Sequence, residues 1–213
     1  MKMYLQSNNN QIRVIEMLKE RSFHSSVYFN GAIYIIGGLS SGIILNNCEY
    51  LQLNNIECLK LPSLKNRQLS SKSIICNNNL YVSEILKENE DCGKICLEYL
   101  NLIKEKEEFH IINIEDKIPL IYDYFFFSSN NYLIFSGGII DDQFNLAIFK
   151  FDPQKGFCEK QENEEKVEVR FTSENSFSFY NEKFYFIDSS NKMIFVAYTE
   201  EMNIKLKCFC EID

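Results

Sequence analysis

The most informative absences in this 213-residue sequence concern basic charge, histidine and long apolar runs. Acidic residues outnumber basic ones and the formal net charge is -8, which disfavours binding to nucleic acid phosphates or to anionic lipid. No stretch approaches the roughly 18 to 20 apolar residues of a membrane-spanning helix. Two histidines are too few for a copper site. We therefore expect neither a nucleic acid partner nor a membrane.

Cysteine is plentiful, but its spacing lacks the pattern of a metal site. The eight cysteines include two close pairs, Cys92 with Cys96 and Cys208 with Cys210, and neither has the Cys-X2-Cys spacing of structural zinc. Disulfide frameworks are typical of short secreted chains, and the opening residues are too polar for a secretory signal. Several cysteines lie in apolar runs, where a reduced thiol packs as a small hydrophobe. We expect a reduced, cytoplasmic protein without metal or cofactor.

Four segments repeat along the chain. They contain IYIIGG at Ile33, LYVSEI at Leu80, LIFSGG at Leu133 and FYFIDS at Phe184, separated by steps of 47, 53 and 51 residues. Each is preceded by an apolar run and a polar turn, as in a β-hairpin, and is followed by two more strand-like runs. The last runs are ECLKL, FHIINI, KVEVRF and IKLKCFC. Four short strands per period predict an all-β fold, a β-propeller whose four-stranded sheets, or blades, cover one another.

Paired glycines end the second strand of two repeats, Gly37 with Gly38 and Gly137 with Gly138. Glycine has no Cβ and adopts positive φ at low cost, so each doublet predicts a close approach between backbone segments. A glycine bulge in an unrelated sheet would explain one doublet equally well. Two doublets after matching strands favour the propeller.

The residues around the doublets resemble kelch repeats. In the first repeat, RSFHSSVYFNGAIYIIGG and CEYLQLNNIECLKLPSL place Arg21 before the first strand, the glycine doublet after the second strand and Tyr50 in the third. Further matches are Arg67, Tyr81 and Tyr99 in the second repeat, Gly137, Gly138 and Phe157 in the third, and Arg170 in the fourth. Phe157 stands where the family usually has tryptophan.

The resemblance is uneven along the chain. Cys58 occupies the tryptophan position of the first repeat, and the second and fourth repeats lack the doublet. Over residues 20–213 it implies kelch-type blades at about 20–66, 67–118, 119–169 and 170–213, while residues 1–19 are interpreted as the last two strands of an incomplete blade. Kelch propellers usually close with more than these four and a half blades. We expect an open or incomplete propeller that self-associates through exposed end blades.

The sequence contains no recognisable catalytic motif: no nucleophile elbow, phosphate-binding loop or His-Glu-X-X-His helix is present. His24, in RSFHSS, is expected to pack or to anchor a loop, and His110, in EEFHII, to lie on the surface. Asp141 and Asp142 follow a doublet and are interpreted as part of a solvated loop. A non-enzymatic protein is therefore expected.

The predicted function is protein–protein interaction, as a scaffold or adaptor, through loops at one rim of the propeller. Arg21, Arg67 and Arg170 enter successive blades and are the candidate partner-binding residues, because guanidinium groups bind carboxylates and phosphates. The favoured alternative for each arginine is that it fixes its own interblade loop. Two other functions stay open: a sugar-processing enzyme of the kelch type, and a degenerate partial propeller without its own activity. No BTB or F-box segment connects the chain to a ubiquitin ligase.

Overall fold

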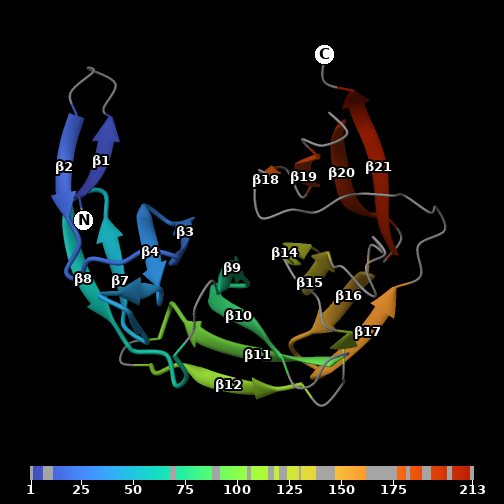
Figure 1. Cartoon of the computed structure of the whole chain (residues 1–213), viewed down its shortest axis with the longest axis horizontal. Coiled ribbons are helices and arrows are strands. Elements are labelled where there is room, and N and C mark those ends of the chain that lie inside the picture. The colour runs from blue at the N-terminus through green and yellow to red at the C-terminus, as the bar shows by residue number, and fades with distance from the viewer. Residues whose placement is uncertain are drawn as a thin grey trace. The chain divides into compact units, whose positions relative to one another are not determined.

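The computed structural model describes residues 2–6, 12–67, 71–87, 92–104, 107–114, 118–119, 124–129, 131–137, 147–161, 177–180, 183–188, 193–200 and 203–211. Every regular element in these ranges is a β-strand (Figure 1). The chain divides into two compact units, residues 1–84 with 97–112 and residues 85–96 with 113–213, which are described separately. Within the described ranges, no helix long and apolar enough to cross a membrane is present.

The first unit is built around two antiparallel sheets, with strand orders β3-β4-β7-β8 and β9-β10-β11-β12. These are the first and second blades. Their strands are β3 (Ser25–Phe29), β4 (Ala32–Ile36), β7 (Cys48–Gln52), β8 (Glu57–Leu61), β9 (Lys72–Cys76), β10 (Asn79–Lys87), β11 (Cys92–Asn101) and β12 (His110–Asn113). The far ends of β10 and β11 belong to the second unit, where β13 (Ile118–Pro119) pairs with β11.

Two shorter hairpins complete the first unit. Strands β1 (Lys2–Gln6) and β2 (Ile12–Glu16) form one two-stranded sheet, and β5 (Leu39–Ser40) and β6 (Ile43–Ile44) form the other. The β5–β6 hairpin lies between the second and third strands of the first blade, where the sequence predicted only a loop. The assignment of β1 and β2 to an incomplete blade, the limits of the blades and the open ring stay predictions.

Asparagine-rich turns close the first hairpin of both blades. In the β3–β4 turn Asn30 and Gly31 have φ of 46° and 77°, and in the β9–β10 turn Asn77 and Asn78 have φ of 49° and 59°. Two consecutive residues with positive φ define the type I′ turn, whose twist matches that of the flanking strands. The hairpins predicted at these positions are confirmed.

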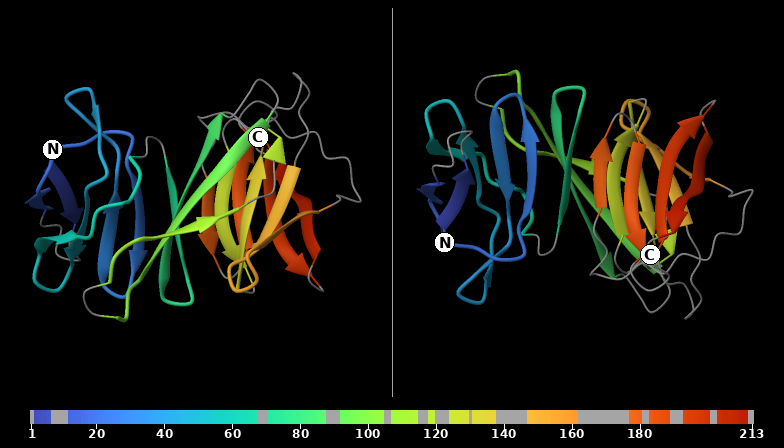
Figure 2. Two further views of the ribbon diagram at one scale, coloured as in Figure 1. Left: turned by 90° about the horizontal axis from the view of Figure 1, so that it is seen from below. Right: turned by 90° about the horizontal axis from the view of Figure 1, so that it is seen from above.

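The first two blades pack against each other through an apolar cluster. Its fully or nearly fully buried members come from both sheets, from the chain between them and from the segment before β12: Ile36, Cys48, Leu64, Leu80, Val82, Leu100 and Phe109. The innermost strands β3 and β9 lie side by side (Figure 2), and the Oγ atoms of Ser25 and Ser73 are 2.7 Å apart. The sheet of the first blade thus covers an apolar face of the second, as predicted for neighbouring propeller blades.

The second unit contains two further four-stranded antiparallel sheets, the third and fourth blades, with strand orders β14-β15-β16-β17 and β18-β19-β20-β21. Aromatic residues fill the third blade, where the rings of Phe126 and Phe135 stack with centroids 4.7 Å apart. The strands are β14 (Tyr124–Ser129), β15 (Tyr132–Gly137), β16 (Ala147–Asp152), β17 (Phe157–Gln161), β18 (Phe177–Tyr180), β19 (Lys183–Asp188), β20 (Met193–Glu200) and β21 (Asn203–Glu211).

One sequence prediction in the second unit needs correction. The fourth strand of the third blade is β17, paired with β16, and not the KVEVRF run, which lies outside the described residues. In β21, Cys208 pairs with Phe195 and Cys210 pairs with Ile194, so a β-bulge at Phe209 separates the two cysteines.

Candidate functional site

Arg21, one of the three arginines predicted at the rim, is buried. Only 4% of the residue is exposed, although it lies in the loop that enters the first blade. Its Nη1 donates to the carbonyl oxygens of Gly37 at 2.7 Å and Asn47 at 2.8 Å, while Nη2 is 2.7 Å from Oε1 of Glu49. The guanidinium is therefore occupied by the protein itself. The rim assignment of Arg21 is wrong, and the alternative that the residue fixes its own loop holds.

Glu49 on β7 is the counterion of Arg21 and also accepts two hydrogen bonds from other parts of the first unit. Its Oε2 accepts hydrogen bonds from the backbone nitrogen of Leu18 at 2.7 Å and from Sγ of Cys58 at 3.1 Å. Burial, together with the hydrogen bond to Glu49, raises the pKa of the Cys58 thiol to about 11. Arg21 and Glu49 thus connect the entering loop, the glycine doublet and the third and fourth strands of the first blade.

Glu98 holds the equivalent place in the second blade, since it precedes Tyr99 as Glu49 precedes Tyr50. It is fully buried, and its oxygens accept hydrogen bonds from the backbone nitrogens of Lys65 at 2.7 Å and Asn66 at 2.9 Å. These residues enter the second blade as Leu18 enters the first. The sequence analysis missed both glutamates, although the repeated Glu-Tyr pair in CEYLQL and CLEYLNL was a detectable signal.

The other two candidate arginines are Arg67 and Arg170. Arg67 is exposed beside Asn66, and whether it contacts a partner stays a prediction. Arg170 lies outside the described residues.

The first glycine doublet meets the requirement predicted for it. Gly37 and Gly38 have φ of 58° and 95°. A Cβ on Gly38 would lie 2.5 Å from the carbonyl oxygen of Ser22, which real Cβ atoms do not tolerate. In the second blade Glu84 and Ile85 replace the doublet, and β10 simply continues to Lys87.

The third repeat's motif residues are only partly described. Gly137 is the last residue of β15, and Phe157 is the first residue of β17, where it pairs with Asp152. Gly138 lies outside the described residues, as do Asp141 and Asp142.

The motif tyrosines stack within their own blades. The rings of Tyr34 and Tyr50 are 5.8 Å apart in the first blade, and those of Tyr81 and Tyr99 are 5.8 Å apart in the second. His110 on β12 extends the second pair, with its ring 5.2 Å from that of Tyr99. These contacts join neighbouring strands of one sheet, so the tyrosines have a packing role.

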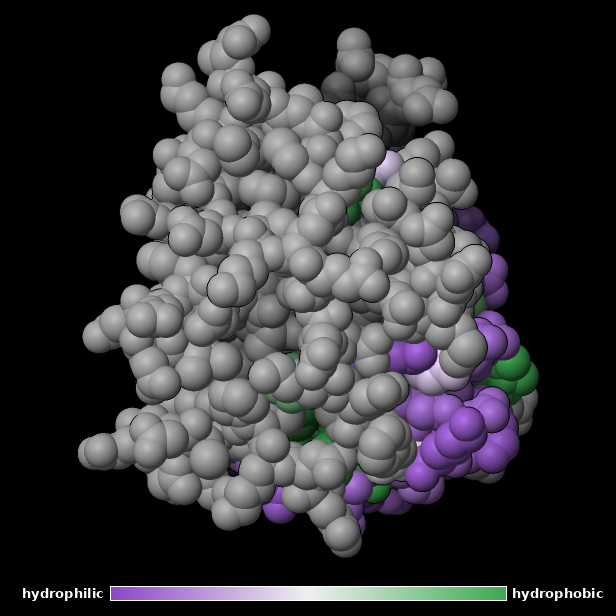
Figure 3. Space-filling view, turned by 90° about the vertical axis from the view of Figure 1, so that its right-hand side faces the viewer, coloured by the Kyte–Doolittle hydropathy of each residue, from purple (hydrophilic) through white to green (hydrophobic). Residues whose placement is uncertain are grey.

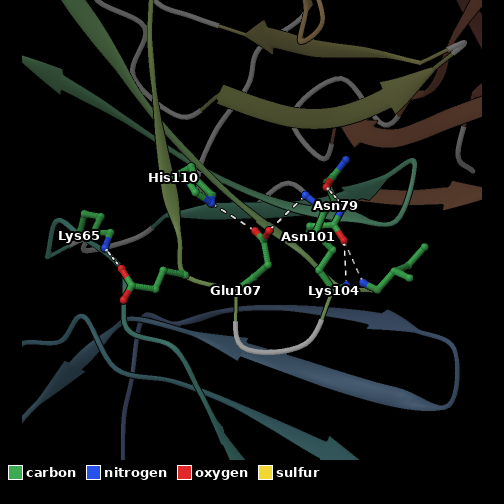
Figure 4. A network of polar contacts seen from close by, with 8 residues as sticks. Lys65, Asn79, Asn101, Lys104, Glu107 and His110 are labelled. Carbon is green, nitrogen blue, oxygen red and sulfur yellow. Dashed lines mark hydrogen bonds and ion pairs between the residues drawn. The ribbon is translucent and has the colours of Figure 1, made fainter.

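A polar network surrounds the turn between β11 and β12 (Figure 4). Glu107 lies 3.3 Å from Nζ of Lys104 and 3.2 Å from Nε2 of His110, and Asn101 donates to Oδ1 of Asn79 at 2.9 Å. Oδ1 of Asn101 also accepts the backbone nitrogen of Lys104 at 3.1 Å. Exposed ion pairs of this kind add little stability. They order a turn and do not form a recognisable catalytic arrangement.

The structure places an unpredicted group of apolar side chains on loops of the first blade. Ser22 and Leu39 exchange two backbone hydrogen bonds, of 2.9 and 2.7 Å, and Leu39 pairs in turn with Ile44 of the β5–β6 hairpin. We call residues 22–23 and 39–44 the loop cluster. Its own turn, at Ser41 and Gly42, has φ of 48° and 78° and is again of type I′.

Three large apolar side chains of the loop cluster are exposed: Phe23 by 64%, Ile43 by 55% and Ile44 by 37%. Phe23 also has a φ of 52°, in the left-handed region that bulky residues avoid. On the face drawn in Figure 3, most of the coloured surface is hydrophilic. The sequence signal for this hairpin was the Ser41-Gly42 turn pair between Leu39-Ser40 and the apolar pair Ile43-Ile44.

Metal ligands are not gathered in the described part of the chain. No group of three or more histidine, cysteine or acidic side chains could hold an ion there. Cys48, Cys58, Cys76 and Cys96 form no disulfide. Burial raises the pKa of Cys48 to about 12, so this thiol stays protonated at neutral pH.

Separate four-stranded antiparallel sheets, packed face to face where the first two blades meet, define a β-propeller. Residues 20–64, which span the first blade and Arg21, match the Kelch motif. The solved structure of YjhT is similar with a TM-score of 0.63 and 14% sequence identity, over 93% of this chain and 67% of that one. No curated protein matches the sequence. The chain is a β-propeller, and its first blade carries the Kelch motif.

Proposed function

We propose that this kelch-type propeller is a non-enzymatic module that binds a protein partner through the loop cluster of its first blade. The observation that carries the proposal is Phe23, a bulky residue held in a left-handed conformation with its ring exposed to solvent. Such strain costs about 1 to 3 kcal/mol and persists where the surroundings enforce it, often at binding sites. Exposed aromatic residues are also frequent anchors of protein interfaces.

The chemistry of the rest of the described molecule supports binding over catalysis. The two buried carboxylates of the first unit, Glu49 and Glu98, are occupied by Arg21 and by the backbone of the entering loops. A net charge of -8 favours a protein over a nucleic acid as the partner. The thiols of Cys48 and Cys76 are buried and form no disulfide, which supports a reducing, cytoplasmic compartment.

The test compares two variants that remove equally exposed aromatic rings. Phe23→Ser acts on the loop cluster, and Tyr28→Ser acts on β3 of the same blade, where Tyr28 is also 64% exposed. Proteins captured from cell extract by the wild type should be lost with Phe23→Ser and kept with Tyr28→Ser. Equal melting temperatures of the two variants would establish that folding is not the cause. Retention of the same partners by Phe23→Ser would refute the proposed site.

A further inference from the structure

The β5–β6 hairpin of the loop cluster has one edge that the chain itself covers. Ser22 and Leu39 exchange two backbone hydrogen bonds, of 2.9 and 2.7 Å, so the N–H and C=O of Leu39 point away from β6. Leu39 lies opposite Ile44 on β6. In an antiparallel ladder, two opposite residues that are not bonded to each other both direct their backbone groups outward. The N–H and C=O of Ile44 therefore point away from β5.

The residues that follow Ile44 show the same alternation. Leu45 donates its N–H back across the hairpin to the carbonyl oxygen of Gly38 at 2.8 Å. Asn46 points outward again and is already paired, because its carbonyl oxygen accepts the backbone N–H of Leu64 at 2.8 Å. Among the described residues, none bonds to the outward N–H or C=O of Ile44. One residue of β6 thus keeps a backbone donor and a backbone acceptor open on its outer side.

The open edge of β6 also lacks the features that usually protect a strand from pairing. Proteins shield exposed edges with charged side chains, proline or a covering loop. Residues 39–45, LSSGIIL, contain neither a charge nor a proline, whereas β8, the outer strand of the first blade, exposes Glu57 and Lys60. On the other side of the hairpin, the positive φ of Phe23 ends the extended backbone after Ser22. A further strand can therefore be added at β6 and not beside Ser22.

We propose that the partner binds as an extended peptide segment, which adds to β6 as a further strand and exchanges two main-chain hydrogen bonds with Ile44. A peptide main chain offers the matching acceptor and donor, and exposed sheet edges are recognised in this way. The peptide residue opposite Ile44 should be apolar, because the Ile44 side chain is 37% exposed and residues 39–45 offer no charge to pair with. This mode of binding rests on the proposed function and adds the chemical class of the partner.

Two proline variants test the direction of the backbone groups on the isolated protein. Ile44→Pro removes an N–H without a partner among the described residues, and proline is tolerated on strand edges whose N–H faces solvent, so the melting temperature should stay close to that of the wild type. Ile43→Pro removes an N–H that faces Ser40 and should lower it. On the wild type, NMR hydrogen exchange should find a fast Ile44 amide between slower amides at Ile43 and Leu45. A slow Ile44 amide would overturn the proposal.

Binding is tested with peptides selected from a random phage-displayed library on the immobilised wild-type protein and measured by calorimetry. Ile44→Pro should weaken their binding by about tenfold or more, because a main-chain acceptor of the peptide loses its donor. The matched control Ile44→Val keeps the N–H and most of the apolar side chain, and it should bind nearly as the wild type does. In the complex, the Ile44 amide should become protected from hydrogen exchange, while the Leu39 amide, which is bonded already, should not change.

The outcomes separate the mode of binding from the proposed function. Peptides that bind Ile44→Pro as tightly as the wild type, or a library that yields no binder, would overturn strand addition. If Phe23→Ser abolishes binding while Ile44→Pro leaves it intact, the proposed site stands and only the strand fails. If neither variant weakens binding, the proposed site fails as well. Protection of the Ile44 amide that rises with protein concentration in the absence of peptide would assign the edge to a second copy of the chain and would also overturn the proposal.

Discussion

Glu49 in the first blade and Phe149 in the third blade occupy the same position in the third strand of their blades. Glu49 pairs with Ile35, and Phe149 pairs with Phe135. Ile35 and Phe135 each lie two residues before the first glycine of a doublet. Glu98 takes this position in the second blade, and Phe195, paired with Phe186, takes it in the fourth. The two compact units therefore differ at one structurally equivalent site, with a carboxylate in the first and an aromatic ring in the second.

The two side chains demand different surroundings. A buried carboxylate must receive hydrogen bonds or a counterion, and here the loop entering the same blade supplies them, through Leu18 and Arg21 or through Lys65 and Asn66. Phe149 is equally buried but needs only apolar neighbours. Blades with glutamate are thus tied to a particular loop conformation, whereas a phenylalanine at this position specifies burial alone.

Removing the cation from the first blade should have the largest effect. Arg21→Met leaves the Glu49 carboxylate buried without its counterion, so we expect a loss of about 3 to 5 kcal/mol in the free energy of unfolding. Urea denaturation measures it. The double variant with Glu49→Met imitates the apolar blades and should recover much of the loss. A loss below about 1 kcal/mol in the single variant would mean that the pair does not organise the blade.

The second prediction separates backbone strain from collision in the first blade. Gly38→Ala should cost about 1 to 3 kcal/mol through its φ of 95°, and more because the new Cβ meets the Ser22 carbonyl. Gly42→Ala is the matched control: its φ is 78°, but nothing lies within 4 Å of the added Cβ. Thermal unfolding of both variants should place Gly38→Ala well below Gly42→Ala. Equal melting temperatures would contradict the close approach.

The smallest effect is expected in the second blade. Glu98→Gln keeps the shape of the side chain but turns an amide NH2 toward a backbone donor, which should cost about 1 to 2 kcal/mol of unfolding free energy. The control Glu108→Gln removes an exposed ion pair with Lys65 and should leave stability unchanged. If both variants unfold at the same urea concentration as the wild type, Glu98 is not a structural anchor.

Local signals in the sequence were sufficient for much of the fold. Type I′ turns at Asn30-Gly31 and Asn77-Asn78 and the first glycine doublet depend only on the backbone freedom of the residues that form them. The fourth strand of the third blade was misplaced because FCEKQ is polar and short, while KVEVRF alternates more clearly. Pattern alone does not decide which of two candidate runs pairs with β16.

The candidate site was harder to predict, because its residues act through partners distant in sequence. Arg21 has the same appearance whether it faces solvent or Glu49, and the two are 28 positions apart. Glu49 lies in CEYLQL, where polar and apolar residues mix as on any half-exposed strand. As a large aromatic residue, Phe23 would be expected in the core, and only its positive φ and its exposed side chain mark it as unusual.

The contrast between Gly37-Gly38 and Glu84-Ile85 has a consequence for how such a chain diversifies. Where the glycines are kept, the backbone leaves the sheet after Ile36 and returns at Cys48, with a small hairpin carried in between. Where they are lost, the same stretch lengthens β10. Inserted residues would be accommodated readily after β4 of the first blade, but poorly within the continuous strand β10 of the second blade. Similar repeats of one chain therefore differ in how easily they can acquire new surface loops.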